Sequence, residues 1–203
     1  MAERTKKKFI VIVIWGMLLV GAILLSAPKQ WFPDFYTPRF MGVGALLFAV
    51  IIFLPQIFFR TSGQHKDFQI KKNVILNLQV ILAVCFLLAG LGELGLWKLY
   101  LYGFEYDKFV HFLVPMMLTI SGSHLLFHWW GLKRKNAVLV TALLVFIGSL
   151  AWEALEFYSD RIFGTQLFGV YGQNLSGDTI WDVVFDILGI SIGWLVARGK
   201  LRR

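Results

Sequence analysis

Six long apolar stretches, separated by short polar segments, dominate the sequence. They cover Phe9–Ala27, Phe40–Phe59, Val74–Trp97, Phe109–Trp130, Ala137–Phe157 and Thr179–Ala197. A helix needs about 20 residues to cross a bilayer, and a segment in lipid must satisfy its backbone hydrogen bonds internally. The pattern therefore predicts an all-α, polytopic bundle of about six transmembrane helices. No repeat or long polar linker divides the chain, so we expect a single integral membrane domain over residues 1–203, with its N-terminal helices within residues 9–97.

The composition of the 203-residue chain excludes an ordinary soluble protein. Hydrophobic residues make up 58% of the chain and charged residues 16%, whereas soluble domains are roughly 45–50% apolar and about 25% charged. The single cysteine, Cys85, excludes a disulfide framework and a thiolate metal cluster. The net charge of +8 would suit a nucleic acid, but no strand-rich aromatic platform accompanies it, so we expect no nucleic-acid partner.

The basic residues indicate how the chain crosses the membrane. If the N-terminus is cytoplasmic, most of the 20 Lys and Arg residues lie in inner segments, among them 6–8, 133–135 and 198–203. Because cytoplasmic loops carry an excess of Lys and Arg, we predict that both termini are cytoplasmic. Anionic lipid of the inner leaflet is the expected partner of these segments.

The acidic residues follow the opposite distribution. All except Glu3 and Asp67 fall in predicted outer loops or in the outer halves of helices. Three helices carry them at helical spacing, as Asp107-x3-His111, as Glu153-x2-Glu156-x3-Asp160 and as Asp178-x3-Asp182-x3-Asp186. Since residues three or four apart share a helix face, each of these helices presents its acidic residues on one face at a similar depth.

Carboxylates at this depth require compensation. A charge inside the hydrocarbon costs about 2.5–3.5 kcal/mol, and Asp186 lies roughly 12 Å along the helix from Asp178. Hard divalent cations prefer oxygen ligands, and an imidazole also admits Zn²⁺, Mn²⁺ or Fe²⁺. The spacing predicts a divalent metal site with the ligands Asp107, His111, Glu153, Glu156, Asp178, Asp182 and Asp186. Two other interpretations are a titrating or water-filled cavity, and interfacial carboxylates paired with Lys98, Lys108 and Arg161.

Two other pairs at helical spacing are interpreted as structural. Gly189 and Gly193 share a face with the acidic residues of the last helix and predict the close approach of a neighbouring helix. His124 and His128 have the spacing of a metal-binding pair, but they lie about 20 Å along the helix from His111. Their position favours an interfacial anchor.

These motifs resemble those of the VanZ-like membrane proteins. That family shows Asp-Lys-x-x-His-Phe, then a Glu-rich helix followed by Arg, then Asp-x3-Asn-x2-Gly-x3-Gly. The matching segments here are 107–112, 153–161 and 182–193, with Asp186 in place of Asn and a longer connection before Asp182. The pairs at 106–107 and 153–156 and the segment from Gly177 are also similar to the YjdF-like bacterial membrane proteins. The resemblance covers residues 106–193 and implies a cell-envelope protein of the plasma or inner membrane.

The leading functional hypothesis is a site on the extracytoplasmic side that binds a divalent metal and acts on a lipid-linked or phosphorylated envelope substrate. The reaction would be a hydrolysis or a phosphotransfer, with His111, Asp107 and Glu156 as candidate catalytic residues. Lys108 and Arg161 would bind the phosphate, and Arg161 opens a Gly-rich connection over residues 161–177. The alternatives are a non-enzymatic transporter of ions or small molecules and a protein that binds lipid or an antibiotic.

Overall fold

The computed structural model describes residues 2–32, 37–59, 66–164 and 175–200. These residues form six long helices and two short 3₁₀ helices, and no strand occurs among them. The long helices are α1 (Glu3–Ser26), α2 (Pro38–Phe58), α3 (Lys66–Glu93), α4 (Tyr106–His128), α5 (Arg134–Phe163) and α6 (Leu175–Lys200). The 3₁₀ helices are η1 (Lys29–Trp31) and η2 (Leu96–Tyr102).

All six long helices are long and apolar enough to cross a membrane, which confirms the predicted all-α, polytopic bundle. Most of them extend several residues beyond the apolar stretches, because their polar ends continue the helical hydrogen bonding. The connection predicted over residues 161–177 is correspondingly shorter, since α5 continues to Phe163 and α6 begins at Leu175. Residues 165–174 of that connection lie outside the described residues.

The predicted third span ends too late. We expected it to reach Trp97, but α3 ends at Glu93 and Trp97 lies in η2. Gly95 has a φ of 123° and Gly103 a φ of 81°, and both values are in a region that side chains with a Cβ rarely adopt. These two glycines therefore let the chain leave α3, form η2 and enter α4.

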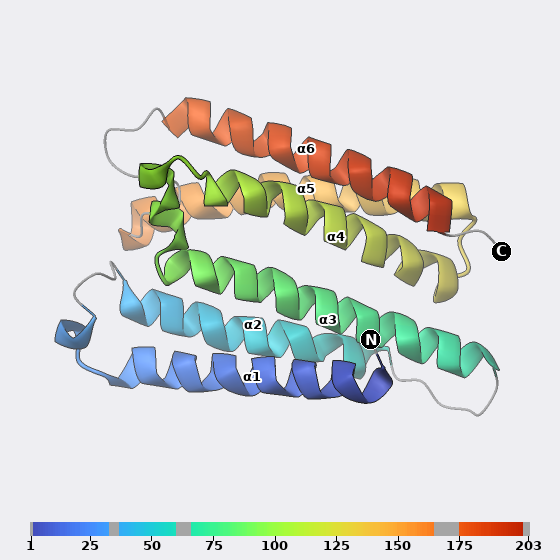
Figure 1. The fold of residues 1–203 in the computed structure, drawn as a ribbon, viewed down its shortest axis with the longest axis horizontal. Helices are drawn as coiled ribbons and strands as arrows, with labels where there is room; N and C mark the ends of the chain where they lie inside the picture. Colours follow the sequence, from blue (N-terminus) through green and yellow to red (C-terminus); the bar gives the residue numbers. More distant parts are fainter. Residues whose placement is uncertain (1, 33–36, 60–65, 165–174, 201–203) are drawn as a thin grey trace.

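The helices lie side by side with their long axes roughly aligned (Figure 1), in two groups of three. Helices α1, α2 and α3 pack on one another, α4 packs on α5 and α6, and the contact of α3 with α4 joins the two groups. Both termini lie at one end of the bundle in Figure 1. The opposite end, where α4 and α6 begin, is called the acidic end below because Asp107 and Asp178 lie there.

The first group of helices is held by an apolar core and by one buried amide. Ile10, Ala49 and Ile52 are almost completely buried between the helices. Gln79 is also fully buried, and its amide donates a hydrogen bond to the Ile52 carbonyl oxygen at 2.9 Å. Its side-chain oxygen accepts a hydrogen bond from Gln56 at 3.2 Å. Polar links of this kind join helices in lipid, where the amide would otherwise lack a partner.

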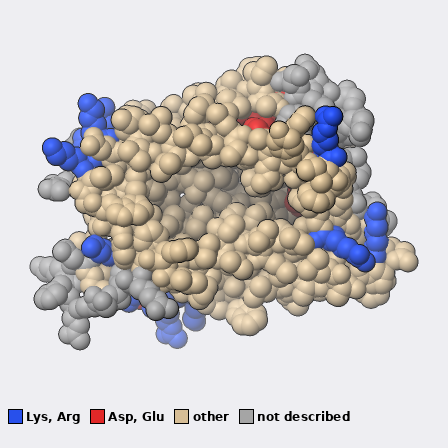
Figure 2. All heavy atoms as spheres, turned by 180° about the vertical axis from the view of Figure 1, so that it is seen from behind, with Lys and Arg blue, Asp and Glu red and all other residues tan. Residues whose placement is uncertain are grey.

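Charge is distributed unevenly over the molecular surface. On the face shown in Figure 2, Lys and Arg gather at the two ends, apolar and other uncharged residues cover the middle, and few acidic atoms are visible. Large apolar side chains such as Leu47, Leu144 and Ile147 are more than half exposed. Apolar side chains on the outside are what a helix bundle surrounded by lipid requires. Three acidic side chains, those of Glu153, Asp182 and Asp186, are instead buried inside the bundle.

Candidate functional site

Close packing of α4 against α6 brings the two most polar helices together. A Cβ at Gly189 would overlap the backbone carbonyl of Phe112, and one at Gly193 would lie 2.8 Å from the Met116 carbonyl oxygen. The absence of a side chain at both positions lets the backbones meet. This confirms the interpretation of the two glycines as a packing feature, and it brings the acidic face of α6 against α4.

The start of α4 is fixed by a contact with α3 and η2. Tyr106 is almost fully buried, and its hydroxyl donates a hydrogen bond to the Leu88 carbonyl oxygen at 2.9 Å. Its ring also meets the Trp97 ring, with 5.2 Å between the ring centroids. The indole occupies space that a side chain at Gly92 would fill. Asp107 and Lys108 directly follow Tyr106, so this contact also holds them in place at the acidic end.

Lys108 lies among three carboxylates at the acidic end. Its Nζ is 2.5 Å from Asp178 Oδ1, 2.6 Å from Asp182 Oδ1 and 3.3 Å from Asp107 Oδ2. The lysine side chain is only 11% exposed. These short contacts come from two helices, α4 and α6, so the ammonium group links them electrostatically.

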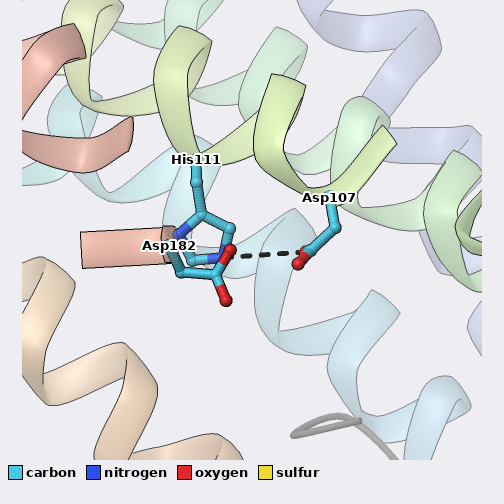
Figure 3. Close-up of side chains that lie close together, drawn as sticks. All are labelled: Asp107, His111 and Asp182. Atoms are coloured by element: carbon cyan, nitrogen blue, oxygen red, sulfur yellow. Dashed lines mark ion pairs between the residues drawn. The ribbon is translucent and has the colours of Figure 1, made fainter. Parts of the chain in front are cut away.

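His111 lies one turn deeper and faces carboxylates on both sides of its ring. Nε2 is 3.7 Å from Asp107 Oδ1 and 3.9 Å from Asp182 Oδ1; Figure 3 shows these three side chains. Nδ1 is 3.2 Å from Asp186 Oδ1 and 3.7 Å from Glu153 Oε1. The imidazole thus separates an outer carboxylate pair from an inner pair, and the inner pair comes from α6 and α5.

The inner carboxylates are buried and incompletely paired. Glu153 is 7% exposed and Asp186 is 2% exposed. Glu153 Oε1 and Asp186 Oδ2 have no hydrogen-bond partner among the described residues. An unsatisfied buried acceptor costs about 1–3 kcal/mol, and more when it carries a charge. The inner part of the network therefore has acceptor capacity that the described side chains do not use.

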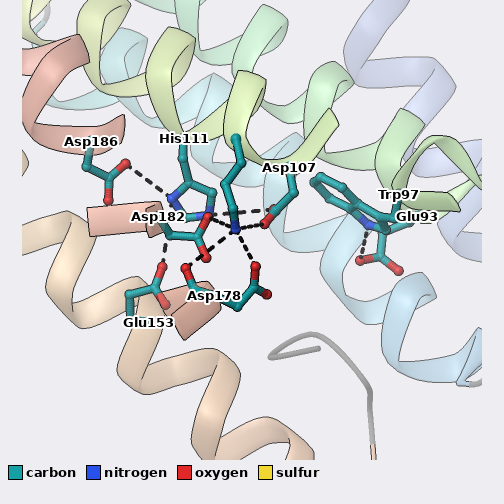
Figure 4. A network of polar contacts seen from close by, with 9 residues as sticks. Glu93, Trp97, Asp107, His111, Glu153, Asp178, Asp182 and Asp186 are labelled. Atoms are coloured by element: carbon teal, nitrogen blue, oxygen red, sulfur yellow. Dashed lines mark hydrogen bonds and ion pairs between the residues drawn. The ribbon is translucent and has the colours of Figure 1, made fainter. Parts of the chain in front are cut away.

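The whole network has more negative than positive groups. Figure 4 shows that carboxylates of α4, α5 and α6 converge on the imidazole. The carboxylates in the ion pairs are those of Asp107, Glu153, Asp178, Asp182 and Asp186. One ammonium and one imidazole face them. Buried charges in lipid require pairing, protonation or a bound cation.

Among the described residues, two groups of side chains have the geometry to hold a metal ion. They are Asp107–His111–Asp182 and His111–Glu153–Asp186, and within each group the ligand atoms lie within 4.8 Å of one another. Two atoms bound to one ion at about 2.1 Å are roughly 3.0–3.4 Å apart for octahedral or tetrahedral geometry. The distances from Nδ1 to Asp186 and Glu153, 3.2 and 3.7 Å, are close to that range. The distances from Nε2 to the outer pair, 3.7 and 3.9 Å, are longer.

The sequence model described as "Predicted membrane protein (DUF2238)" matches residues 7–203 of the chain. The chain belongs to this family. Membership agrees with the six membrane-spanning helices and supports a multi-pass location in a membrane. No curated protein and no solved structure matches the chain. The family description names neither a reaction nor a ligand, and the similarity to VanZ-like proteins stays a prediction.

Most of the residues predicted for the site come together, and two lie outside the ion-pair network. Glu156, one turn beyond Glu153 in α5, is half-buried and accepts a hydrogen bond from Trp152. Arg161 is exposed in the last turn of α5. Neither takes part in the contacts around Lys108 and His111 described above. Their predicted roles therefore depend on a substrate that would lie nearer the acidic end.

Three further side-chain contacts lie around the network or along α4. The contact of Tyr106 with Leu88 has no spacing signal, because the two residues belong to different helices. Glu93 accepts a hydrogen bond from the Trp97 indole at 3.3 Å and lies apart from the His111 network in Figure 4. His124 and His128 are stacked, with 5.9 Å between ring centroids, towards the other end of α4. Of these contacts, only that of Tyr106 with Leu88 depends wholly on the fold, because the other two join residues four positions apart.

Proposed function

We propose that this protein is an integral membrane protein that binds a divalent cation between α4, α5 and α6 through His111, Glu153 and Asp186. The observation that carries the proposal is the pair of buried carboxylate oxygens, Glu153 Oε1 and Asp186 Oδ2, that have no hydrogen-bond partner among the described residues. Both belong to side chains that face His111 Nδ1. A divalent cation beside Nδ1 would bind Glu153 and Asp186 in place of the 3.2 Å hydrogen bond that Nδ1 shares with Asp186 Oδ1, and it would offset the negative charge of the network.

The surroundings of His111 suit this role. A histidine that binds metal through one ring nitrogen usually donates its other N–H group to a carboxylate. With a cation on the Nδ1 side, Nε2–H would point towards Asp107 and Asp182, which lie within 3.9 Å. Lys108 in turn neutralises these two carboxylates. Asp107, Asp182 and Lys108 would therefore support the histidine from the side opposite the metal ion.

We further propose that the site acts on a phosphorylated or lipid-linked substrate at the outer membrane surface. A divalent cation would polarise phosphoryl oxygens and lower the pKa of a bound water, which would be the nucleophile of a hydrolysis. In a phosphotransfer the hydroxyl group of an acceptor molecule would take the place of that water. Glu156 and Arg161 continue along α5 from Glu153 towards its C-terminal end. Glu156 would transfer a proton to or from the substrate from the α5 side of the site, and Asp107 and His111 would do so from the α4 side. Arg161 would contact the phosphate. Asp178 contacts Lys108 at the acidic end.

The packing of α4 against α6 favours binding over transport. The contacts at Gly189 and Gly193 close the space between the two helices below Asp186. Buried polar side chains such as Thr119 and Ser123 continue along α4, but Ser123 donates its hydrogen bond to the Thr119 carbonyl oxygen of its own helix. A continuous ion pathway at this interface would require α4 and α6 to separate.

The metal content of the purified protein tests the proposal. We expect wild-type protein in detergent, incubated with MnCl₂ or ZnCl₂ and freed of excess metal, to retain a stoichiometric amount by elemental analysis. Asp186→Asn and Glu153→Gln each remove a ligand charge, so metal affinity should fall by more than about 10-fold, since outer-shell changes alone cost about 10–100-fold. Glu105→Gln, at an exposed residue just before α4, is the matched control and should bind as wild type.

A wild-type protein that retains no metal, or variants that bind metal as wild type does, would overturn the metal site. The reaction is tested separately, by the release of inorganic phosphate from a long-chain alkyl diphosphate in detergent micelles. Release that depends on the metal and is lost in Asp186→Asn would support the enzymatic part. Absence of release in a protein that binds metal would leave a binding protein.

A further inference from the structure

The network around Lys108 and His111 contains two candidate cation positions, and a side chain of the protein fills one of them. The first position lies between His111 Nδ1, Glu153 and Asp186. The second surrounds Lys108 Nζ, which lies 2.5 to 3.3 Å from the carboxylates of Asp107, Asp178 and Asp182. It shares Asp107 and Asp182 with the outer of the two groups described for His111. The following inference rests on the proposed metal site and concerns how many ions it holds.

We infer that the ammonium group of Lys108 takes the place of a second divalent cation, so that the site binds one metal ion and not two. The contact lengths support this assignment. Nζ is 2.5 Å from Asp178 Oδ1 and 2.6 Å from Asp182 Oδ1, which are short even for hydrogen bonds between charged groups. No carboxylate at this position has a buried oxygen without a partner. Among the described residues, the buried carboxylate oxygens without a hydrogen-bond partner are Glu153 Oε1 and Asp186 Oδ2, both at the inner position.

Two carboxylates lie between Lys108 and the outer side of the His111 ring. Asp182 Oδ1 is 2.6 Å from Lys108 Nζ and 3.9 Å from His111 Nε2. Asp107 contacts Nζ with Oδ2 at 3.3 Å and faces Nε2 with Oδ1 at 3.7 Å. The imidazole ring separates these two carboxylates from the inner position. The two positions therefore share no carboxylate, unlike two metal ions held by bridging carboxylates about 3.5–4 Å apart.

The charge balance explains why one position is provided with an internal cation. Lys108 is tethered to α4, so its charge is present whatever the metal concentration, and it links α4 to Asp178 and Asp182 of α6. A second dissociable ion would leave three carboxylates of like charge close together whenever it departed. Like charges in a low-dielectric environment repel strongly. The lysine therefore keeps Asp107, Asp178 and Asp182 together at the acidic end. Only the inner position is then left for an exchangeable metal ion.

The number of bound ions tests this inference. Lys108→Met removes the charge and retains an unbranched side chain of similar length, so the outer carboxylates become available. With MnCl₂ as the probe, we expect elemental analysis to give one ion for each wild-type chain and two for each Lys108→Met chain. Lys108→Arg keeps the positive charge and should hold one ion. Lys98→Met, at an exposed lysine of η2, is the matched control and should also hold one.

If Lys108→Met is unstable without metal, the measurement is repeated on protein purified in MnCl₂, and the thermal midpoint is recorded with and without the ion. A variant rescued by Mn²⁺ that holds one ion more than wild type supports the inference. A variant with the same number of ions as wild type, or a wild type with two, overturns it. A wild type with none and a Lys108→Met variant with one would overturn the proposed metal site but support the role of the lysine.

Discussion

At the scale of single residues, the orientation of one imidazole determines which carboxylates can act together. His111 presents Nδ1 to Glu153 and Asp186 and Nε2 to Asp107 and Asp182. A neutral imidazole has one N–H donor and one acceptor nitrogen, so only one side of the ring can bind a metal at a time. The assignment of the inner side follows from the unpartnered oxygens there and from the ammonium group of Lys108 on the outer side.

Two substitutions of His111 distinguish the two sides of the ring. An asparagine side chain places its amide near the position of Nδ1, whereas a glutamine side chain reaches the position of Nε2. We therefore expect His111→Asn to retain more metal affinity than His111→Gln, with both below wild type, in a competition titration with a metal-sensitive dye. The reverse order would indicate that the ion binds on the side of Asp107 and Asp182.

At the scale of helices, the contact of α4 with α6 determines the depth and the rotation of both acidic faces. The face of α6 that carries Asp182 and Asp186 continues into Gly189 and Gly193, which lie on the α4 backbone around Phe112 and Met116. Because both glycines lack a side chain, the helices approach until their backbones touch. The same approach brings Asp182 within 2.6 Å of Lys108 and Asp186 within 3.2 Å of His111.

A methyl group at this contact should separate the two helices. Gly189→Ala is expected to lower the unfolding midpoint in detergent, by an amount that corresponds to about 1–3 kcal/mol, because the added Cβ would overlap the Phe112 carbonyl. It should also weaken metal binding, since α6 moves relative to His111. Gly148→Ala is the control. Its Cβ would meet no atom within 4 Å, and it should be neutral or stabilising by up to about 1 kcal/mol. Equal stability of the two variants would exclude a structural role for Gly189.

At the scale of the whole molecule, the charges are separated along the bundle axis. Both termini lie at one end (Figure 1), and the Lys108–His111 network lies towards the other, where α4 and α6 begin. The end of the bundle that holds both termini is called the terminal end. Its basic residues include Lys6, which donates a hydrogen bond to Asn77 at 2.6 Å, and Lys72, which pairs with Glu3 at 2.9 Å. We predict that this end is cytoplasmic, since cytoplasmic segments carry an excess of Lys and Arg.

Labelling of introduced cysteines tests the predicted orientation. The native thiol, Cys85, is buried, so an impermeant thiol reagent should leave the wild-type protein unlabelled. In intact spheroplasts we expect labelling of Lys98→Cys, in η2 at the acidic end, and no labelling of Lys135→Cys, in the first turn of α5 at the terminal end. Permeabilised spheroplasts should label both variants. Labelling of Lys135→Cys alone in intact spheroplasts would show that the orientation is opposite to the predicted one.

The physics of the bilayer explains why the helices were predictable. A segment in lipid must form its own backbone hydrogen bonds, so apolar stretches of sufficient length become helices whatever their neighbours are. Only the ends of the helices depended on local detail. Helix α3 ends at Glu93, four residues before the predicted end of the span at Trp97, and the chain turns at Gly95. Helical spacing likewise showed which carboxylates share a face, because that spacing is a property of one helix.

The sequence by itself determined the class of protein, the six spans, and the set of acidic residues together with His111. The tertiary structure alone decided which of these residues meet. Lys108, for which the sequence suggested either phosphate binding or pairing with carboxylates, contacts Asp107, Asp178 and Asp182. Glu153 Oε1 and Asp186 Oδ2 have no hydrogen-bond partner among the described residues. These residues come from different helices, and their pairing depends on how closely and at what rotation α4, α5 and α6 pack. Spacing along one helix carries no information about the rotation of another, so only the packed bundle distinguishes the carboxylates that surround a lysine from those at the proposed metal position.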